Sequence, residues 1–402
     1  MQATDPANFF FEMGPIRPPS EGRDYSLLLR TTRNCAWNRC EFCPTYRGQK
    51  FGYRKVAGIK RDIDVAKTLH DEIKEVAARG PGGRITQDVL RAIWEANPQI
   101  YREAAGNLAL KWQNLVNLAN WINSGAVTVF LQDADAFIML TPHLVEALAY
   151  LKETFPTIAR VTAYGRSKSV ARKSPEELAQ IRQAGLVRLH VGLESGCDEV
   201  LARMKKGVTA REQVDAGCKA VAAGISLSEY MMPGLGGKEL SDRHARDSAA
   251  VLTEINPDFI RLRSLVLRRQ SPLLDQSRNG QFTELGEDEI VEEIGLLIEN
   301  LHCRSYLTSD QMANLLYEVE GRLPEDKEAM LRTIGDYRRK SPAERLAFRL
   351  SRRVQSFLAV YGILEPELQQ KVEEAREALR LGRPDAGMKT EAAVSALKEG
   401  FV

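Results

Sequence analysis

Segments that read as buried strands, each followed by a helical pattern, recur six times between about residues 24 and 275. These strand segments are residues 26–32, 126–131, 159–164, 187–193, 225–231 and 259–267. Strands that alternate with helices form parallel sheets from right-handed βαβ units. The alternation therefore predicts an α/β fold, and the six units can either lie as an open sheet or close into a partial barrel.

Local signals mark where several helices begin. A capping box, in which an N-cap Ser or Thr is followed three residues later by Glu, predicts helices that start at Ser174, Thr209 and Ser341. Proline in the first turn predicts further helices at Pro142 and Pro366.

Two stretches depart from the alternation. More than eighty residues separate the first two strand segments, and helical patterns within them predict a helical insertion over about residues 62–123. After Gly286 the chain reads as purely helical, and one of these helices is expected to begin at Thr308. The predicted domains are an N-terminal extension of residues 1–23, a βα domain of residues 24–282 and a helical C-terminal domain of residues 283–402.

Apolar stripes in the C-terminal region need a partner surface, because isolated amphipathic helices are marginally stable in water. We expect the stripes of residues 290–301 and 346–358 to pack on one another and on one edge of the βα domain. Such packing would close a pocket that six strands leave open.

Composition excludes several classes of protein. The 56 Lys and Arg residues nearly balance the 54 Asp and Glu residues, so no strong overall field attracts nucleic acid or an anionic membrane. No apolar run approaches the roughly 20 residues of a membrane-spanning helix. The N-terminal residues lack the basic and then apolar pattern of a signal peptide. We therefore expect a soluble, cytoplasmic protein without a membrane partner.

Three of the six cysteines, Cys35, Cys40 and Cys43, crowd into nine residues. In a cytosolic chain such cysteines act as ligands or catalysts more often than as disulfides. Three thiolates suit zinc or an iron–sulfur cluster, but structural zinc requires a fourth protein ligand that this region lacks. The pattern favours an iron–sulfur site with one corner left for another molecule.

Four other residues that could carry chemistry are expected to have structural roles. His190 lies in a buried strand pattern, and Cys218 lies between two alanines of a helix, so we expect both in the hydrophobic core. Cys197 is expected to be buried near a helix start. Cys303 would be an active-site thiol only if the helical tail folds over the mouth of the βα domain.

The strand, the three-cysteine loop with Phe42 before its last cysteine, and the βα repeat together resemble the radical S-adenosylmethionine (SAM) superfamily. The usual family spacing is C-x₃-C-x₂-C, whereas this loop reads C-x₄-C-x₂-C and is one residue longer. The resemblance covers about residues 24–275. It implies a partial (β/α)₆ TIM-like barrel, a 4Fe–4S cluster bound by Cys35, Cys40 and Cys43, and SAM as the second cofactor.

The resemblance also implies that SAM lies across the carboxyl ends of the strands, next to Phe42. Asp133 and Asp135 follow the second strand, where the family holds the amino group of SAM. Glu194 ends the fourth strand, where a polar residue binds the ribose, and Lys206 occupies the expected place of a cation for the methionyl carboxylate. The alternatives are a helix cap or solvated turn for the aspartates and a solvated basic patch for Lys206.

Three further residues belong to the implied SAM site. Arg166 and Ser167, which follow the third strand, are weaker candidates for the same carboxylate. Gly234 lies in the glycine turn after the fifth strand, where the lack of a Cβ atom lets the backbone approach the adenine.

The activity implied by the resemblance is reductive cleavage of SAM to a 5′-deoxyadenosyl radical, which abstracts hydrogen from a substrate. A low-potential flavodoxin or ferredoxin would supply the electron. Arg261 and Arg263 share one face of the sixth strand and could clamp an anionic small molecule. Alternatively, both arginines pair with helix carboxylates.

Two other functions stay open at this point. A member of the same superfamily could modify RNA or a protein, and the footprint of RNA would be a basic run formed by Arg338, Arg339, Lys340, Arg345, Arg349, Arg352 and Arg353. A non-catalytic iron–sulfur or zinc protein would need only the cysteines.

Overall fold

The computed structural model describes residues 10–16, 18, 25–101 and 108–400. Most of the predicted N-terminal extension, residues 1–9, 17 and 19–23, lies outside the described residues, as does Asp24. The chain divides into two compact units: residues 1–38, 48–191 and 219–226 form the first, and residues 39–47, 192–218 and 227–402 form the second. Among the described helices, none has the length and apolarity needed to cross a membrane.

The first unit contains parallel strands in the order β1 (Leu27–Arg30), β4 (Thr128–Gln132), β5 (Arg160–Gly165) and most of β6 (Leu186–Glu194), whose last three residues belong to the second unit. All five residues of β4 are buried, as expected for a parallel strand covered on both faces. Beside this sheet, β2 (Thr32–Arg33) and β3 (Gly52–Tyr53) form a small antiparallel pair that flanks the cysteine loop in the sequence.

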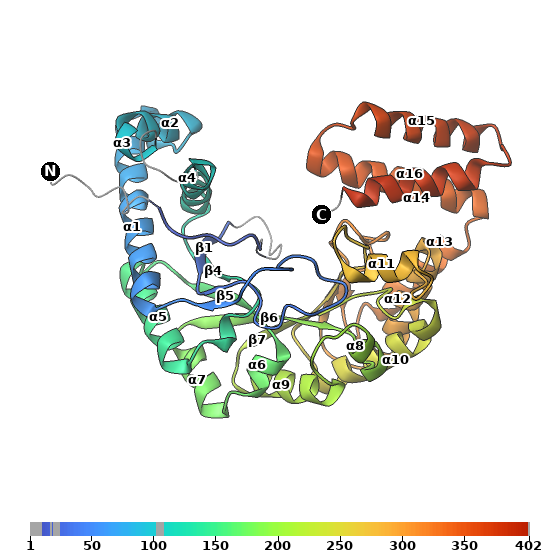
Figure 1. Cartoon of the computed structure of the whole chain (residues 1–402), viewed down its shortest axis with the longest axis horizontal. Helices are drawn as coiled ribbons and strands as arrows, with labels where there is room; N and C mark the ends of the chain where they lie inside the picture. Colours follow the sequence, from blue (N-terminus) through green and yellow to red (C-terminus); the bar gives the residue numbers. More distant parts are fainter. Residues whose placement is uncertain (1–9, 17, 19–24, 102–107, 401–402) are drawn as a thin grey trace. The chain divides into compact units, whose positions relative to one another are not determined.

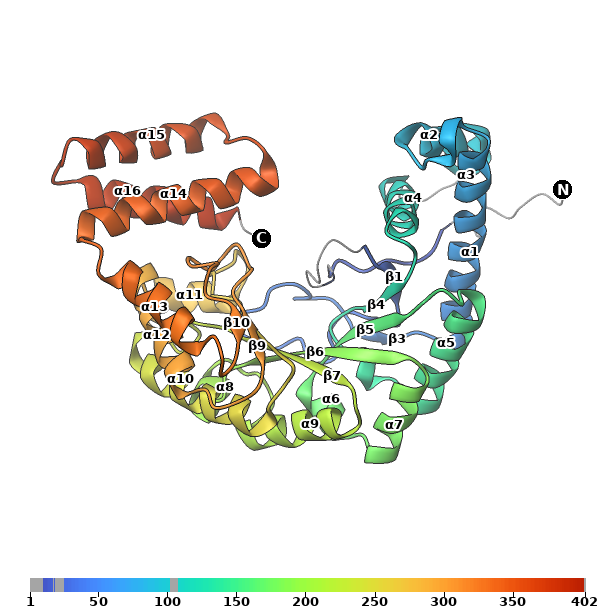
Figure 2. The same cartoon turned by 180° about the vertical axis from the view of Figure 1, so that it is seen from behind.

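Helices of the first unit include the predicted insertion. It starts at α1, which begins at Val56, a little earlier than expected, and packs against β1, α4 and α5. The short helices α2 and α3 lie at one end of α1 (Figures 1 and 2). The helices are α1 (Val56–Ala78), α2 (Gln87–Ala96), α3 (Pro98–Tyr101), α4 (Leu108–Asn123), α5 (Thr141–Thr154), α6 (Ser167–Ala171) and α7 (Pro175–Gln183), with 3₁₀ turns at Pro81–Gly83 and Ala136–Ile138.

The second unit contains the parallel strands β7 (Ser226–Met231), β8 (Phe259–Leu262) and β9 (Tyr306–Thr308), followed by the antiparallel β10 (Gly321–Arg322). Its helices are α8 (Asp198–Arg203), α9 (Ala210–Ala222), α10 (Gly237–Ile255), α11 (Pro272–Arg278), α12 (Glu287–Asn300), α13 (Lys327–Arg338), α14 (Pro342–Tyr361), α15 (Pro366–Arg380) and α16 (Ala386–Glu399). Both units are thus built from consecutive βα units with parallel strands, which confirms the α/β class.

The capping boxes begin helices where they were predicted. Ser174 accepts a hydrogen bond from the Glu177 N–H, and the Glu177 carboxylate accepts one from the Ser174 N–H. The same exchange starts α14 at Ser341 and α9 at Thr209.

The C-terminal region is helical as predicted, except for two short strands. The helix expected at Thr308 is absent, because residues 306–308 pair with β8 and extend the sheet as β9. The sixth predicted strand is shorter than expected and ends at Leu262.

The predicted packing of the two C-terminal stripes on one another is wrong. Helix α12 packs on α10 and α13, whereas α14 packs with α15 and α16 (Figures 1 and 2). Helices α15 and α16 cover the apolar face of α14. The three helices share a hydrophobic cluster formed by Leu350, Val354, Phe357, Val372, Ala375, Ala393 and Leu397. Charged groups join α14 to α12 instead, through a 2.6 Å ion pair between Arg353 and Glu287.

Candidate functional site

The cysteine loop follows β2, and its three cysteines are half-buried. The Asn38 N–H donates to the Cys35 Sγ at 3.4 Å, and the Cys43 N–H donates to the Cys40 carbonyl at 3.3 Å. The Cys43 thiol donates to the Thr45 hydroxyl at 3.7 Å. A backbone N–H directed at a cysteine sulfur is the kind of contact that tunes iron–sulfur clusters, so the donors of this loop fit such a group.

No cysteine of the chain forms a disulfide, and all six lie within the described residues. In the same part of the chain, no three His, Cys, Asp or Glu side chains are gathered into a group ready to hold a metal ion. The assignment of Cys35, Cys40 and Cys43 as cluster ligands therefore rests on their spacing and on the chemistry of the thiols.

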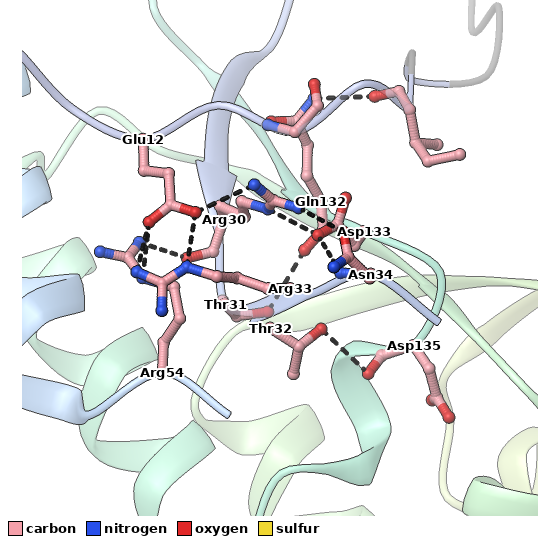
Figure 3. Close-up of polar contacts among 12 residues, drawn as sticks. Glu12, Arg30, Thr31, Thr32, Arg33, Asn34, Arg54, Gln132, Asp133 and Asp135 are labelled. Carbon is pink, nitrogen blue, oxygen red and sulfur yellow. Dashed lines mark hydrogen bonds and ion pairs between the residues drawn. The ribbon is translucent and has the colours of Figure 1, made fainter. Parts of the chain in front are cut away.

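Asp133 lies directly after β4 and is fully buried. Its Oδ2 atom accepts hydrogen bonds from Arg30 Nε at 2.6 Å and from the Asn34 N–H at 3.0 Å (Figure 3). Arg30 also donates to the Asn34 side chain at 3.1 Å. Because Asn34 precedes Cys35 in the chain, the buried carboxylate fixes the start of the cysteine loop.

The N-terminal segment belongs to the same network, which the sequence analysis missed. Glu12 accepts hydrogen bonds from Arg30 at 2.9 Å and from Arg33 at 2.7 Å (Figure 3). The Gln132 amide exchanges hydrogen bonds with the backbone of Gly14 at 2.8 and 3.0 Å. A Cβ atom on Gly14 would lie 2.3 Å from Asp133 Oδ1, so only glycine fits there.

Asp135 is also fully buried, and protein groups occupy both its oxygens. The Ser169 hydroxyl donates to Oδ2 at 2.5 Å, and the Arg166 N–H donates to Oδ1 at 3.3 Å. Burial raises the pKa of Asp135 to about 6, although the Ser169 hydrogen bond and the Arg166 charge oppose the shift. These contacts tie Asp135 to the start of α6, and its side chain makes no capping hydrogen bond to the 3₁₀ turn Ala136–Ile138 that follows it.

Arg166 and Ser167 lie at the start of α6, the helix that contacts this carboxylate through Ser169. The Arg166 guanidinium lies 5.4 Å from the ring centroid of Trp37, which belongs to the cysteine loop, and Ser167 is buried. The first unit thus brings Asp133, Asp135, Arg166 and Ser167 to the carboxyl ends of β4 and β5, as predicted.

The stability of the chain should depend on pH through Asp135. Its pKa is about 6 in the folded chain and 3.8 ordinarily, so the folded state binds a proton more tightly than the unfolded state. This favours folding at low pH, and the contribution, about 3 kcal/mol, is lost as the pH rises from about 4 to about 6.

We expect Asp135→Asn to remove that loss and Asp88→Asn, a change at an exposed carboxylate, to leave it in place. Urea unfolding between pH 4 and pH 7 measures both variants. Equal pH dependence of the wild type and Asp135→Asn would contradict the prediction.

Glu194 and Lys206 form a nearly buried ion pair in the second unit, with 3.1 Å between Lys206 Nζ and Glu194 Oε1. Lys206 also lies 5.8 Å from the centroid of the Phe42 ring. Glu194 has a φ of +64°, a conformation that non-glycine residues adopt rarely and mostly at functional sites. A Cβ atom on Gly192 would lie 2.2 Å from Glu194 Oε1, so the glycine leaves room for the carboxylate.

Glu229 is a further polar residue near this pair, and the sequence analysis missed it. It lies in β7, is 2% exposed, and its Oε2 atom has no hydrogen-bond partner among the described residues. Burial raises the pKa of Glu229 well above its ordinary value; the Glu194 charge adds to this, whereas the Lys206 charge opposes it. The available signal was a single charged residue within a strand segment.

Gly234 lies in the turn after β7 and has a φ of +88°, which requires glycine. Its N–H donates to Glu293 Oε1 at 2.7 Å. The buried Glu293 also accepts a hydrogen bond from Ser241 at 2.5 Å. The backbone of this turn is therefore held in one conformation by α10 and α12.

Arg261 and Arg263 have protein partners in the structure. Arg261 is buried and lies 3.4 Å from the carboxylate of Asp310. Arg263 follows the end of β8, and its guanidinium lies 4.7 Å from the ring centroid of Tyr230. The alternative that a carboxylate pairs with the arginine therefore holds for Arg261, except that this carboxylate, Asp310, lies in a loop and not in a helix.

Of the remaining residues, His190, Cys197 and Cys303 are buried. The prediction that Cys218 lies in the core is wrong, because this residue is exposed. Ala216 and Ala220 are buried and four positions apart, so they share one face of α9, and Cys218 between them points the other way.

Comparisons with known proteins give distant matches. The chain is 23% identical over 122 residues to a tRNA uridine(34) acetyltransferase of Methanocaldococcus infernus, which is 30% of this chain and 23% of that protein. The chain thus spans less than a quarter of this curated relative. Among solved structures, methylornithine synthase (PylB) gives a TM-score of 0.41 at 15% identity, over 78% of this chain and 71% of that chain. Coproporphyrinogen III oxidase (HemN) from Escherichia coli gives 0.39 at 12% identity, over 70% and 54%.

The model of the family described as the radical SAM superfamily matches residues 109–248. The match includes β4 to β7 and contains Asp133, Asp135, Glu194 and Lys206, whereas the cysteine loop precedes it. Enzymes of this family use a 4Fe–4S cluster and SAM. Residues 109–248 of the chain therefore match a domain of the radical SAM superfamily, whose members are enzymes.

Proposed function

We propose that this chain cleaves SAM reductively at a 4Fe–4S cluster bound by Cys35, Cys40 and Cys43. When bound, the cluster and SAM supply an electron and a 5′-deoxyadenosyl radical, which abstracts hydrogen from a substrate. The observation that carries the proposal is the three-cysteine loop, placed after β1 and ahead of the matched family domain. Three thiolates leave one corner of the cluster for SAM.

Lys206 and Glu194 are proposed to bind the two ends of SAM. The Lys206 ammonium would attract the methionyl carboxylate, while the Glu194 carboxylate would accept hydrogen bonds from the ribose hydroxyls. In the structure these groups neutralise each other, and Phe42 covers Lys206. Binding would replace a nearly buried ion pair by two charge-assisted contacts, so little unpaired charge would be left in the site.

Asp133, Asp135, Arg166 and Ser167 are proposed to shape the part of the site that takes the SAM amino group. Hydrogen bonds of the two aspartates tie the loop after β4 to Asn34 and to α6. Gly234 would offer a close backbone surface to the adenine. Because these loops are already ordered, they can orient a cofactor without a loss of binding energy to loop ordering.

A small molecule is the proposed substrate. Some relatives are named as tRNA-modifying enzymes, which favours RNA as the second candidate. Against RNA, the basic run of the tail is used within the protein. Lys340 lies over the Phe348 ring, and each arginine of the run pairs with a carboxylate. The pairs are Arg338 with Glu292, Arg339 with Asp336, Arg345 and Arg349 with Asp288, Arg352 with Glu318, and Arg353 with Glu287.

A low-potential flavodoxin or ferredoxin is the proposed electron donor, since the chemistry needs one electron for each cleavage. A reducing, cytoplasmic location is proposed as well, because the six cysteines form no disulfide. The family match favours an enzyme over a non-catalytic metal-binding protein.

Glu194→Gln tests the proposed site. We expect SAM to bind about 10- to 100-fold more weakly, because the ribose loses a charged hydrogen-bond acceptor. Calorimetry on the anaerobically reconstituted protein measures the affinity, and iron and sulfide content should be unchanged because the cysteine loop is untouched. Glu239→Gln, at an exposed surface pair, is the control. Unchanged SAM affinity in Glu194→Gln would contradict the assigned role.

A further inference from the structure

A cavity of about 640 Å³ lies next to the cysteine loop within the second unit. Pro44 and Thr45 of that loop form one side of the cavity, and Leu267, Arg268 and Arg269, which follow β8, form another. The end of α16 completes it with Glu399. The walls therefore combine an apolar surface with two guanidinium groups and one carboxylate, that of Glu399.

Arg268 is the exceptional cation of this cavity. Arg269 pairs with Glu399 at 3.0 Å, and both side chains of that pair are largely exposed. Arg268 is half-buried, its Nε atom is buried without a hydrogen-bond partner, and among the described residues no carboxylate pairs with it. A guanidinium that is partly withdrawn from water and lacks an anion is costly, and its planar donors match carboxylate or phosphate.

The cavity also lies close to the third cysteine. Thr45 lines it, and the Thr45 hydroxyl accepts the 3.7 Å hydrogen bond of the Cys43 thiol. A molecule in the cavity would thus contact the residues that hold Cys43. Arg261 and Arg263, by contrast, are engaged with Asp310 and Tyr230.

We propose that this cavity binds the oxyanion group, carboxylate or phosphate, of the substrate, with Arg268 as its main ligand. Leu267 would contact the apolar part of the same molecule. The assignment of the anion to the substrate rests on the proposed function. The binding of an anion at Arg268 does not depend on it.

The probes are inorganic phosphate and acetate, titrated into the purified full-length chain by calorimetry. We expect the wild type to bind at least one of them, and Arg268→Gln to weaken that binding by at least about tenfold. Arg268→Lys should retain part of it, because the charge remains and the planar donors are lost. The matched control is Arg278→Gln, at an exposed residue near the same segment. The stronger probe identifies the anion as phosphate or carboxylate.

A second measurement links the cavity to the cysteine loop. In cluster-loaded protein, the bound anion should shift the electron paramagnetic resonance spectrum of the reduced cluster in the wild type and leave it unchanged in Arg268→Gln. Equal anion binding by the wild type and Arg268→Gln, or a bound anion that leaves the wild-type spectrum unchanged, would overturn the proposal. Failure to assemble any cluster would count against the proposed function alone, since the titration decides anion binding without it.

Discussion

Replacing any one of Cys35, Cys40 and Cys43 by alanine should abolish both the cluster and the cleavage of SAM. Three thiolates are the smallest set that holds a 4Fe–4S cluster with one corner open, so a single loss removes a required ligand. The effect should be complete, not graded, and iron, sulfide and the visible absorption of the reconstituted protein report it directly.

Cys218→Ala provides the matched control for these variants. Cys218 is exposed on α9 and is separated in the sequence from the cysteine loop, so its removal should leave iron and sulfide at the wild-type level. A variant without all three loop cysteines that still bound full iron and sulfide would show that the ligands lie elsewhere.

Replacing Arg353 by methionine should destabilise the C-terminal part of the second unit by about 3–5 kcal/mol, because it removes one of the two cations that pair with the buried Glu287 carboxylate, the other being Lys398. Arg353 is 1% exposed, donates to Glu287 at 2.6 Å and also donates to the carbonyls of Met312 and Asn314 at 2.7 and 2.9 Å. Burial would raise the pKa of Glu287, but the charges of Lys398 and Arg353 lower it below its ordinary value.

Two further variants separate this ion pair from general packing. Arg338→Met removes an exposed pair with Glu292 and should change the free energy of unfolding by less than about 0.5 kcal/mol. The double variant Glu287→Leu with Arg353→Met should be more stable than Arg353→Met alone, since no buried charge is left unpaired. Urea unfolding measures all three, and a double variant less stable than Arg353→Met would contradict this explanation.

Features set by short stretches of sequence were predictable. The Ser174 and Ser341 capping boxes each act within four residues, and they begin α7 and α14 in the structure as predicted. The buried strands β4 to β7 were also readable, because their apolar runs and the following helices repeat in order.

Features that depend on residues distant in the sequence were not predictable. Residues 306–308 form a strand only because β8 is beside them, and the stripe of α14 finds α15 and α16 instead of α12. Polar partners follow the same rule, since Asp133 is bound by Arg30 and Arg261 by Asp310. Nothing in the local sequence distinguishes these charges from solvated ones, which is why Glu12 was missed entirely.

The candidate site was predictable to the extent that strand ends determine it. Glu194 was assigned from its position at the end of β6 and Lys206 from its position after that strand, and the structure brings them together at 3.1 Å with Phe42 nearby. Glu229 shows the limit, because the position of a lone carboxylate relative to this pair depends on how β7 is placed. Burial and an unpartnered oxygen make it visible only in three dimensions.

The formation of 5′-deoxyadenosine is the most direct test of the central claim. The anaerobically reconstituted wild-type chain, given SAM and a strong low-potential reductant such as dithionite, should release 5′-deoxyadenosine and methionine in equal amounts even without its substrate, while Cys43→Ala should release neither. A wild-type protein with a full 4Fe–4S cluster and bound SAM that formed no 5′-deoxyadenosine would contradict the account.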